Sequence, residues 1–332
     1  MRIILIGSVN SSLVTLSKLL QYEMNVVAVM GLESGNTARV SGLVSLREKA
    51  EDHQVPFFGF SKINDQAEQI IALEPDLIFV VGLSQLVSSK IINSATHGCV
   101  GFHPTKLPAG RGRAPLGWLT YDQGEGAATF FKIADGVDDG PIYVQQSFVV
   151  QKEDDAKRVS GRIQLAVEQA LDIWLPRLKL GHLESVEQDH RRASYHGIRK
   201  PDDGWLDWQS DAKTLHRLIL SAARPHPGAY TFCGPEKIII WGAREDYQRA
   251  YRGVVGRIQH VTAEKHFIVQ TGEGGLLRVS EYEALGHPDW SPKVGDLLGY
   301  YEQAEIFELK GQVTQLLERV AALEHKLQSS DT

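Results

Sequence analysis

The sequence predicts an α/β protein with an open, mostly parallel, Rossmann-like sheet, followed by a small β-rich C-terminal domain and a C-terminal helix. Three observations predict this architecture. In the first third of the chain, short apolar segments alternate with amphipathic ones, which is typical of a parallel sheet covered by helices on both faces. Downstream of residue 224, short alternating segments are separated by glycine-containing turns, and the last segment of the chain carries a regular apolar repeat.

Apolar segments of the first third are expected to be strands: residues 3–6, 25–30, 56–60, 77–82 and 99–102. Helices are expected between them, where apolar residues recur at helical spacing, over residues 13–20, 65–73 and 84–92. Because ligands of such sheets bind at the carboxyl ends of the strands, a polar residue directly after one of these strands is a candidate site residue.

The pattern changes after residue 113. Residues 127–133 and 142–150 are expected to form an antiparallel pair around a turn at 136–140, followed by a long amphipathic helix over 154–178. The polar stretch 184–209 is interpreted as a linker or wrapping loop, and it leads to a helix at 212–222. Short strands are then expected at residues 238–242, 254–261, 267–271 and 276–281, which favours a small barrel or sandwich.

These elements divide into an α/β core at 1–183, a linker with a helix at 184–223, a small β-barrel-like domain at 224–300 and an amphipathic helix at 301–332. Within that helix, the apolar residues keep strict three–four spacing: Ile306, Leu309, Val313, Leu316, Val320, Leu323 and Leu327. Two interpretations stay open. The helix packs on its own domain, or it pairs with a second copy of the chain. Glutamate and lysine flank the stripe, which favours a homodimer.

Composition argues against several classes of protein. The chain has 332 residues and a net charge of −6, so neither a nucleic-acid partner nor attraction to an anionic membrane is indicated. Its cysteines, Cys99 and Cys233, are far apart and form no ligand pair, which fits a reducing compartment. The apolar run at residues 3–6 is too short for a signal peptide, and no stretch reaches the ~20 apolar residues of a membrane span. We therefore expect a cytoplasmic protein.

A histidine and a carboxylate carry the strongest functional signal. His103 ends the predicted strand at 99–102 and is followed by a proline- and arginine-rich segment, residues 104–115, that we expect to be neither helix nor strand. Asp138 lies further along, in the glycine-bracketed turn at 136–140. An imidazole and a carboxylate in loops that follow strands are what proton transfer requires. A purely structural histidine is the alternative.

A metal site is not expected at this histidine. His97, Cys99 and His103 lie on the same face of the predicted strand, but three ligands on one strand do not converge, since alternate side chains are about 7 Å apart. The turn after the first strand, residues 7–12, also lacks the G-x-G-x-x-G pattern of dinucleotide binding. We expect no metal and no nicotinamide cofactor.

Four segments together resemble one family. Residues 103–108 (HPTKLP) with 111–115 (RGRAP) are similar to the signature of formyltransferases that use 10-formyltetrahydrofolate, and residues 136–142 (GVDDGPI) are similar to their second signature. Residues 200–208 (KPDDGWLDW) resemble a segment of the branch that formylates nucleotide-linked amino sugars. The resemblance implies a formyltransferase core over residues 1 to about 180, with 10-formyltetrahydrofolate as the formyl donor and no metal.

The resemblance assigns the catalytic histidine to His103 and the catalytic aspartate to Asp138. Asp138 is expected to keep His103 charged and oriented and to assist deprotonation of the amine, while His103 polarises and protonates the reacting groups. The family has an asparagine two residues before the histidine, where this chain has Gly101, which alternatively opens the site. Losing such an oxyanion donor costs roughly 10²–10³ in rate. The expected substitutes are Thr105, a backbone N–H of residues 104–113, or protonated His103.

The resemblance also implies contacts to both substrates. The expected folate contacts are Gly82, Leu83, Leu86, Arg113, Ala134, Gly136, Val137 and Asp138. The expected nucleotide-sugar contacts are phosphate-facing polar residues and stacking aromatic residues: Ser8, Asn10, Lys106, Arg111, Tyr195 and Trp205. For the turn at residues 7–12, an alternative is that Asn10 or Ser11 is only a helix N-cap.

The implied reaction is transfer of a formyl group to the primary amine of a UDP- or dTDP-linked amino sugar of the 4-amino-4,6-dideoxyhexose type, for surface polysaccharide or glycan biosynthesis. Residues 200–208 favour this acceptor, and the mixed charge of residues 224–300 disfavours methionyl-tRNA, whose formylation is the first alternative. An alternative of another class is a folate-binding module without transferase activity, because Gly101 replaces the family's asparagine.

Overall fold

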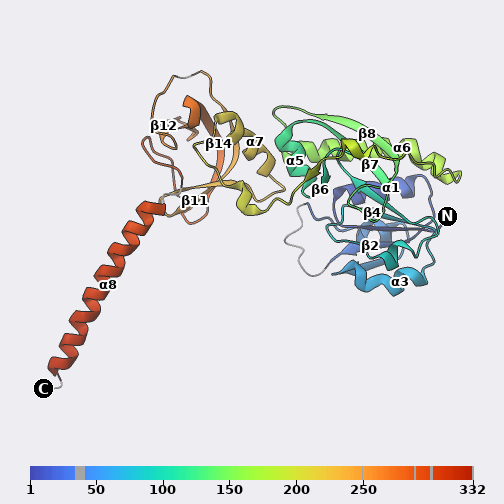
Figure 1. Ribbon diagram of the computed structural model, residues 1–332, viewed down its shortest axis with the longest axis horizontal. Coiled ribbons are helices and arrows are strands. Elements are labelled where there is room, and N and C mark those ends of the chain that lie inside the picture. Colours follow the sequence, from blue (N-terminus) through green and yellow to red (C-terminus); the bar gives the residue numbers. More distant parts are fainter. Residues whose placement is uncertain (34–41, 249, 288, 300–301, 331–332) are drawn as a thin grey trace. The chain divides into compact units, whose positions relative to one another are not determined.

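The computed structural model describes residues 1–33, 42–248, 250–287, 289–299 and 302–330 (Figure 1). The chain divides into two compact units. The first contains Met1–Trp205, Lys213–Ala229 and Trp241–Ala243, and the second contains Leu206–Ala212, Tyr230–Ile240 and the chain from Arg244 onward. The polar stretch up to Trp205 therefore packs with the first unit.

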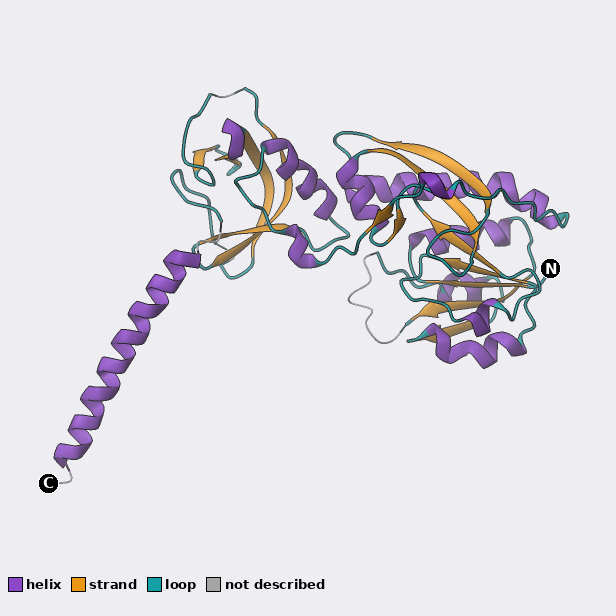
Figure 2. Ribbon diagram, viewed as in Figure 1, coloured by secondary structure: helices purple, strands orange, loops and turns teal. Residues whose placement is uncertain are grey.

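The first unit is built on a seven-stranded sheet in the order β3-β2-β1-β4-β5-β7-β8. Figure 2 draws the strands in orange and the helices in purple. Its strands are β1 Ile3–Gly7, β2 Val26–Leu32, β3 Phe57–Phe60, β4 Leu77–Val81, β5 Cys99–His103, β7 Gly124–Lys132 and β8 Ile142–Val150. Strands β1 to β5 pair in parallel, whereas β7 is antiparallel to both β5 and β8. This confirms the predicted open, mostly parallel α/β sheet.

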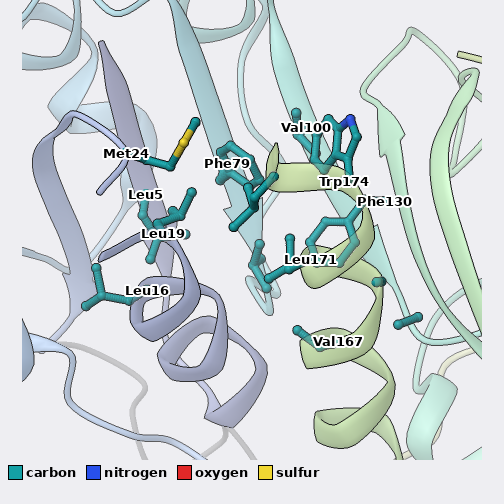
Figure 3. Close-up of a cluster of buried hydrophobic side chains, with 14 of the residues drawn as sticks. Leu5, Leu16, Leu19, Met24, Phe79, Val100, Phe130, Val167, Leu171 and Trp174 are labelled. Atoms are coloured by element: carbon teal, nitrogen blue, oxygen red, sulfur yellow. The ribbon is translucent and has the colours of Figure 1, made fainter. Parts of the chain in front are cut away.

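Up to Lys179, the helices of this unit are α1 Asn10–Gln21, α2 Arg47–Asp52, α3 Ala67–Ala72, α4 Ser89–Ile92, α5 Pro115–Asp122 and α6 Ala156–Lys179. Alternate residues of β1 face opposite ways, Ile3 into one hydrophobic cluster and Ile4 into another. Leu16 of α1 and Leu171 of α6 pack in the first cluster (Figure 3), and Ile70 of α3 packs in the second. Both faces of the sheet are thus covered by helices, and the loops lie at the ends of the strands.

The helix expected at 84–92 is reduced to α4, and residues 83–88 form a loop instead. Asn64 explains the difference. Its side chain donates a hydrogen bond to the carbonyl of Leu86 (3.0 Å) and accepts one from the backbone N–H of Ser88 (2.9 Å). Such bonds offer the backbone an alternative to helix formation. Gln85 adds bonds from this loop to the backbone of Ile63 and Ser61. Residues 83–88 therefore form a loop after β4, at the carboxyl end of the sheet.

The segment expected to be neither helix nor strand contains both. Strand β6, Arg111–Gly112, pairs in parallel with β9, Tyr195–His196, and α5 begins at Pro115. Proline suits the first position of a helix because its missing N–H has no intrahelical partner there. The partner of β6 comes from the polar stretch far along the chain, so nothing in the local sequence marks Arg111–Gly112 as a strand.

The second unit contains a small antiparallel sheet in the order β10-β11-β14-β13-β12. Its strands are β10 Ala229–Cys233, β11 Glu236–Glu245, β12 Ile258–Val261, β13 Phe267–Gln270 and β14 Leu276–Ala284. β10 is not among the predicted strands, because the proline- and glycine-rich residues 225–228 directly before it resemble a long loop.

Short 3₁₀ turns along the chain lie at Ile63–Gln66, His190–Arg192, Pro201–Gly204 and Gly272–Gly274.

Two further helices confirm sequence predictions. α7 spans Ala212–Ala222, as the sequence indicated, and α8 spans Glu302–Ser330, slightly longer than the apolar repeat. Within the described ranges, no helix combines the length and the apolar character needed to cross a membrane.

Candidate active site

The structure brings His103 and Asp138 together. His103 is the last residue of β5, at the carboxyl end of a parallel strand. Its Nδ1 lies 3.6 Å from Oδ2 of Asp138, and the two side chains are 7% and 20% exposed. The imidazole is therefore buried, whereas the carboxylate remains partly accessible to solvent.

Asp138 reaches His103 because the turn that carries it folds back along the sheet. In the β5–β7 pairing, His103 lies opposite Thr129, and β7 continues to Lys132 beside the start of β5. The connection to β8 must then return toward the other end of β5. Gly140 is required on this path, since a Cβ there would lie 1.8 Å from the carbonyl oxygen of Lys132.

The hydrogen bonds of His103 fix where its proton lies. The carbonyl of Gly110 can only accept, so Nε2–H of His103 donates to it (2.9 Å), and the neutral ring turns the lone pair of Nδ1 toward Asp138. Burial lowers the pKa of His103, Asp138 and the Gly110 carbonyl oppose this only in part, and nearby His196 adds to it. The ring is therefore neutral near pH 7, which contradicts the expectation that Asp138 keeps His103 charged in the resting protein.

The loop after β5 is tied back to the sheet by polar side chains. Thr129 of β7 donates to the carbonyl of Thr105 (2.7 Å), and the Gln145 amide donates to the carbonyl of Leu107 (3.0 Å). Thr105 itself is buried, and its hydroxyl donates to the Gly110 carbonyl (3.3 Å). Because this hydroxyl is used inside the loop, Thr105 is not placed to serve as the expected oxyanion donor.

A segment that we call the strap, residues 188–196, holds the other side of this loop. The backbone N–H of Arg111 donates to the carbonyl of Ser194 (2.9 Å), and that of Arg113 donates to the carbonyl of His196 (3.1 Å). These bonds form the β6–β9 pairing. The strap comes from the stretch interpreted as a linker, so part of that stretch belongs to the site.

Gln188 joins the loop to the turn that carries Asp138. Its Oε1 accepts from the Arg111 guanidinium (2.7 Å), and its amide group donates to the carbonyls of Asp138 (2.9 Å) and Gly140 (2.7 Å). Arg111 is 1% exposed and also donates to the hydroxyl of Tyr195 (3.0 Å). This burial contradicts the expectation that Arg111 faces substrate phosphates. The sequence analysis missed Gln188, because a glutamine in a polar stretch has no distinguishing pattern.

Comparison with known proteins identifies the family. The sequence profile of the formyl transferase family matches residues 2–173, more than half of the chain, and the profile of the formyl transferase C-terminal domain matches residues 199–292. The chain belongs to the formyl transferase family. This confirms the resemblance carried by residues 103–108 and 136–142, and it makes the protein an enzyme of formyl-group transfer.

Several solved structures share the fold of this chain. The sugar 3N-formyl transferase WlaRD, crystallised with dTDP and 5-N-formyl-THF, gives a TM-score of 0.64 at 15% identity, covering 86% of this chain and 98% of WlaRD. HypX from Aquifex aeolicus, in complex with tetrahydrofolic acid, gives 0.61 at 15% identity, covering 91% of this chain and 51% of HypX. The methionyl-tRNA formyltransferase from Clostridium thermocellum gives 0.54 at 17% identity, covering 75% and 95% of the two chains. At these identities the likeness shows a common fold.

The residues of this formyl transferase that we expect to contact folate lie in the loop after β4 and in the β7–β8 connection, apart from Arg113 beside β6. Leu86 is 87% exposed and Val137 56% exposed. The others are exposed or half-buried: Gly82, Leu83, Arg113, Ala134, Gly136 and Asp138. Leu86 and Val137 thus present apolar side chains to solvent in the loops after β4 and β7.

Two of the expected nucleotide-sugar contacts lie at the start of α1. Ser8 is 1% exposed and its hydroxyl donates to the carbonyl that follows β4 (3.0 Å), so it is committed within the protein. Asn10 is the first helical residue and is half-buried, with Val9 as the N-cap. Ser12 Oγ accepts from the Val9 N–H (3.2 Å). The alternative in which Asn10 or Ser11 is the N-cap is therefore wrong. Val9 is the N-cap, and Ser12 in the first turn accepts from its backbone N–H.

The other expected contacts of the formyl transferase differ in their accessibility. Lys106 forms an exposed ion pair with Glu125 (2.7 Å). Tyr195 is 64% exposed, and Trp205 is half-buried. In the part of the chain that the structure describes, no three His, Cys, Asp or Glu side chains are placed to hold a metal ion.

Gly101, which stands where the family has asparagine, lies in β5 directly opposite Phe131 of β7. Opposed residues on antiparallel strands project to the same face. A Cβ at Gly101 would lie 2.7 Å from the Phe131 ring and 3.1 Å from the Ile133 side chain. Phe131 is only 4% exposed, so its ring fills this space. The interpretation that Gly101 opens the site is therefore wrong.

We expect Gly101→Asn to destabilise the enzyme by about 1–3 kcal/mol, because the new side chain overpacks against Phe131. Urea unfolding measures this cost. In a Phe131→Ala background the cost should be smaller, since the ring is gone. Gly161→Asn is the matched control, because a Cβ there meets nothing within 4 Å. Equal costs in the two backgrounds would contradict the packing explanation.

Proposed function

We propose that this formyl transferase moves a formyl group from 10-formyltetrahydrofolate to the primary amine of a nucleotide-linked amino sugar, of the 4-amino-4,6-dideoxyhexose type. The observation that carries the proposal is the pairing of His103 and Asp138, 3.6 Å apart at the carboxyl end of β5. Exposed Leu86 and Val137 supply apolar surface for the pterin of the folate.

The hydrogen-bonding of His103 gives each group a role. The bound folate supplies an electrophilic formyl carbon, and the acceptor supplies a neutral amine. When the amine nitrogen attacks, its proton moves to Nδ1 of His103, which has a free lone pair because Nε2–H donates to the Gly110 carbonyl. The carboxylate of Asp138 stabilises the resulting imidazolium, and the same proton then passes to the leaving nitrogen. The chain's own residues complete this cycle without a covalent intermediate.

Several observations support an amino-sugar acceptor. Residues 200–208 resemble the sugar-modifying branch, and the net charge of −6 offers little for a tRNA acceptor. WlaRD, whose fold matches over 98% of its length, is a sugar 3N-formyl transferase that was crystallised with dTDP. Exposed Tyr195, Arg113 and Lys106 are the side chains left to stack on a base or to approach phosphates.

An acceptor panel tests the proposal. The enzyme is incubated with 10-formyltetrahydrofolate and, separately, dTDP- and UDP-linked 4-amino and 3-amino sugars, methionyl-tRNA, or no acceptor. A mass gain of one formyl group on an amino sugar supports the proposal. Formylation of methionyl-tRNA alone supports the first alternative, release of formate without acceptor indicates hydrolysis, and folate binding without any turnover indicates a binding module.

The proposal includes a homodimer held by α8. The side chains of Ile306, Leu309, Val313, Leu316, Val320 and Leu323 are between 49% and 59% exposed. A helix in water is stabilised mainly by packing of its apolar face, so this stripe calls for a partner. With Ile306 as heptad position a, β-branched residues occupy three a positions and leucines three d positions, which favours two parallel strands.

Charge complementarity points to a second copy of this chain as that partner. In a parallel pair, position g of one helix faces position e of the next heptad in the other. The sequence puts Glu305 at g against Lys310 at e, and Arg319 at g against Glu324 at e. Gly311, the weakest helix former, falls at the outward position f, where a Cβ would meet nothing within 4 Å.

We expect Leu316→Lys in the full chain to raise the dimer dissociation constant by about 100-fold, because two ammonium groups would meet in one apolar layer. Sedimentation equilibrium measures this. Gln315→Lys, at the outward position c, is the matched control and should leave the dimer intact. A monomeric wild-type chain at micromolar concentration, or equal behaviour of the two variants, would exclude dimerisation through α8.

A further inference from the structure

Gln188 is a buried polar residue whose amide is fully used between two parts of the site. It is 5% exposed. Its Oε1 accepts from Arg111 of β6, and its Nε2 donates to the carbonyls of Asp138 and Gly140. The amide therefore links the loop after β5 to the turn after β7.

The Asp138 turn needs such a bridge. Asp138 has a φ of 50°, in the left-handed region that non-glycine residues rarely adopt. The turn also runs back along the sheet instead of closing a tight hairpin between β7 and β8. On one side, Oδ2 of Asp138 accepts from the backbone N–H of Gly112 (2.8 Å). On the other side, the carbonyls of the same turn are held by Gln188.

We propose that Gln188 is a positioning residue for formyl transfer: by locking the Asp138 turn to Arg111, it holds the Asp138 carboxylate against Nδ1 of His103. This inference rests on the proposed function of His103 and Asp138. The strap is therefore part of the catalytic apparatus, although none of its residues needs to touch the formyl group.

Hydrogen-bonding chemistry makes glutamine the required residue. Arg111 can only donate, so it selects the oxygen of the amide, and the two backbone carbonyls can only accept, so they select the nitrogen. A glutamate at this position would keep the bond to Arg111 and would even strengthen it. Its second oxygen would then repel both carbonyls and release the turn. Gln188→Glu thus separates the role of Gln188 toward Asp138 from its role toward Arg111.

The experiment compares Gln188→Glu and Gln188→Leu with Gln123→Leu. Gln123 is a matched control because its amide also donates to a backbone carbonyl, that of Lys152 (2.7 Å), away from His103. The readouts are kcat, KM for 10-formyltetrahydrofolate, urea unfolding, and NMR titration of the His103 imidazole in labelled protein without substrates. A His103→Asn sample assigns the His103 signal among the 12 histidines.

We expect both Gln188 variants to lower kcat by about 10²-fold, the cost of a misplacement of around 1 Å, with KM little changed. Asp138 raises the pKa of His103, so its displacement should move the His103 titration to lower pH. Gln123→Leu should change neither quantity. Gln188→Leu should also lose stability, because buried Arg111 loses one of its acceptors, and Gln188→Glu should lose less, because it keeps the bond to Arg111.

Two results would overturn the inference. One is a Gln188→Glu enzyme with wild-type kcat and an unmoved His103 titration. The other is a loss of kcat confined to Gln188→Leu and matched by a loss of stability, which indicates a purely structural bond to Arg111. The titration needs no substrate, so it separates this inference from the proposed function. A shifted titration in an enzyme that formylates no amino sugar refutes the acceptor and leaves the positioning role supported.

Discussion

His103→Asn is expected to lower kcat by about 10²–10⁴-fold, because it removes the group that exchanges protons with the reacting amine. An asparagine amide can still donate to the Gly110 carbonyl, so the loop should keep its conformation. It has no lone pair of comparable basicity to turn toward Asp138. Kinetics with 10-formyltetrahydrofolate and the acceptor identified by the panel measure the loss. KM should change far less than kcat.

His182→Asn is the matched control for this prediction. His182 also has its Nδ1 next to a carboxylate, that of Glu184 (2.9 Å), but the pair is exposed and lies outside the site. Its replacement should leave kcat unchanged. If His103→Asn retained wild-type kcat, His103 would be a structural histidine, and the chemistry would have to be assigned elsewhere.

Asp138→Asn is expected to lower kcat by about 10²-fold or more and to shift the acid limb of the pH–rate profile to lower pH. Burial lowers the pKa of His103 and the Asp138 carboxylate raises it, so removing the charge lowers it further and weakens the base. An asparagine oxygen can still accept from the Gly112 N–H, which preserves the turn. Asp135→Asn, an exposed carboxylate of the same connection, is the control.

Asp138→Asn should also change how the stability of the protein depends on pH. The unfolded chain takes up a proton at His103 near the ordinary histidine pKa of about 6.5, whereas the folded chain resists it down to lower pH. Stability should therefore fall as the pH drops below that value, and more steeply in Asp138→Asn. Urea unfolding at several pH values measures this. An unchanged acid limb together with an unchanged pH dependence of unfolding would mean that Asp138 does not act on His103.

The sequence was sufficient to predict the large sheet and the proximity of His103 and Asp138, for physical reasons. The parallel strands β1 to β5 are short, mostly apolar runs, so they can be located without the structure, and His103 was placed at the end of the last one. Asp138 was found because glycines bracket its turn. Elements whose conformation depends on side-chain bonds to distant backbone groups were not predictable, such as the loop held by Asn64 and Gln85.

The parts of the site that the sequence concealed are those built by contacts across long distances in the chain. Gln188 and His196 lie in a polar stretch without periodicity, and their role appears only once β9 is paired with β6. Arg111 has the appearance of a phosphate ligand in sequence, and only its burial against Gln188 shows otherwise. Gly101 was recognised as unusual, but the Phe131 ring that explains it comes from another strand.

We expect the β6–β9 pairing to limit how far the chain can be shortened without loss of activity. A fragment that ends at residue 173, where the N-terminal profile match stops, keeps every strand of the large sheet. It lacks β9, so the backbone groups of Arg111 and Arg113 lose their partners, and Asp138 loses the Gln188 amide. Chimaeras that exchange C-terminal domains between family members should therefore be joined after His196, so that β6 keeps β9 of the same chain.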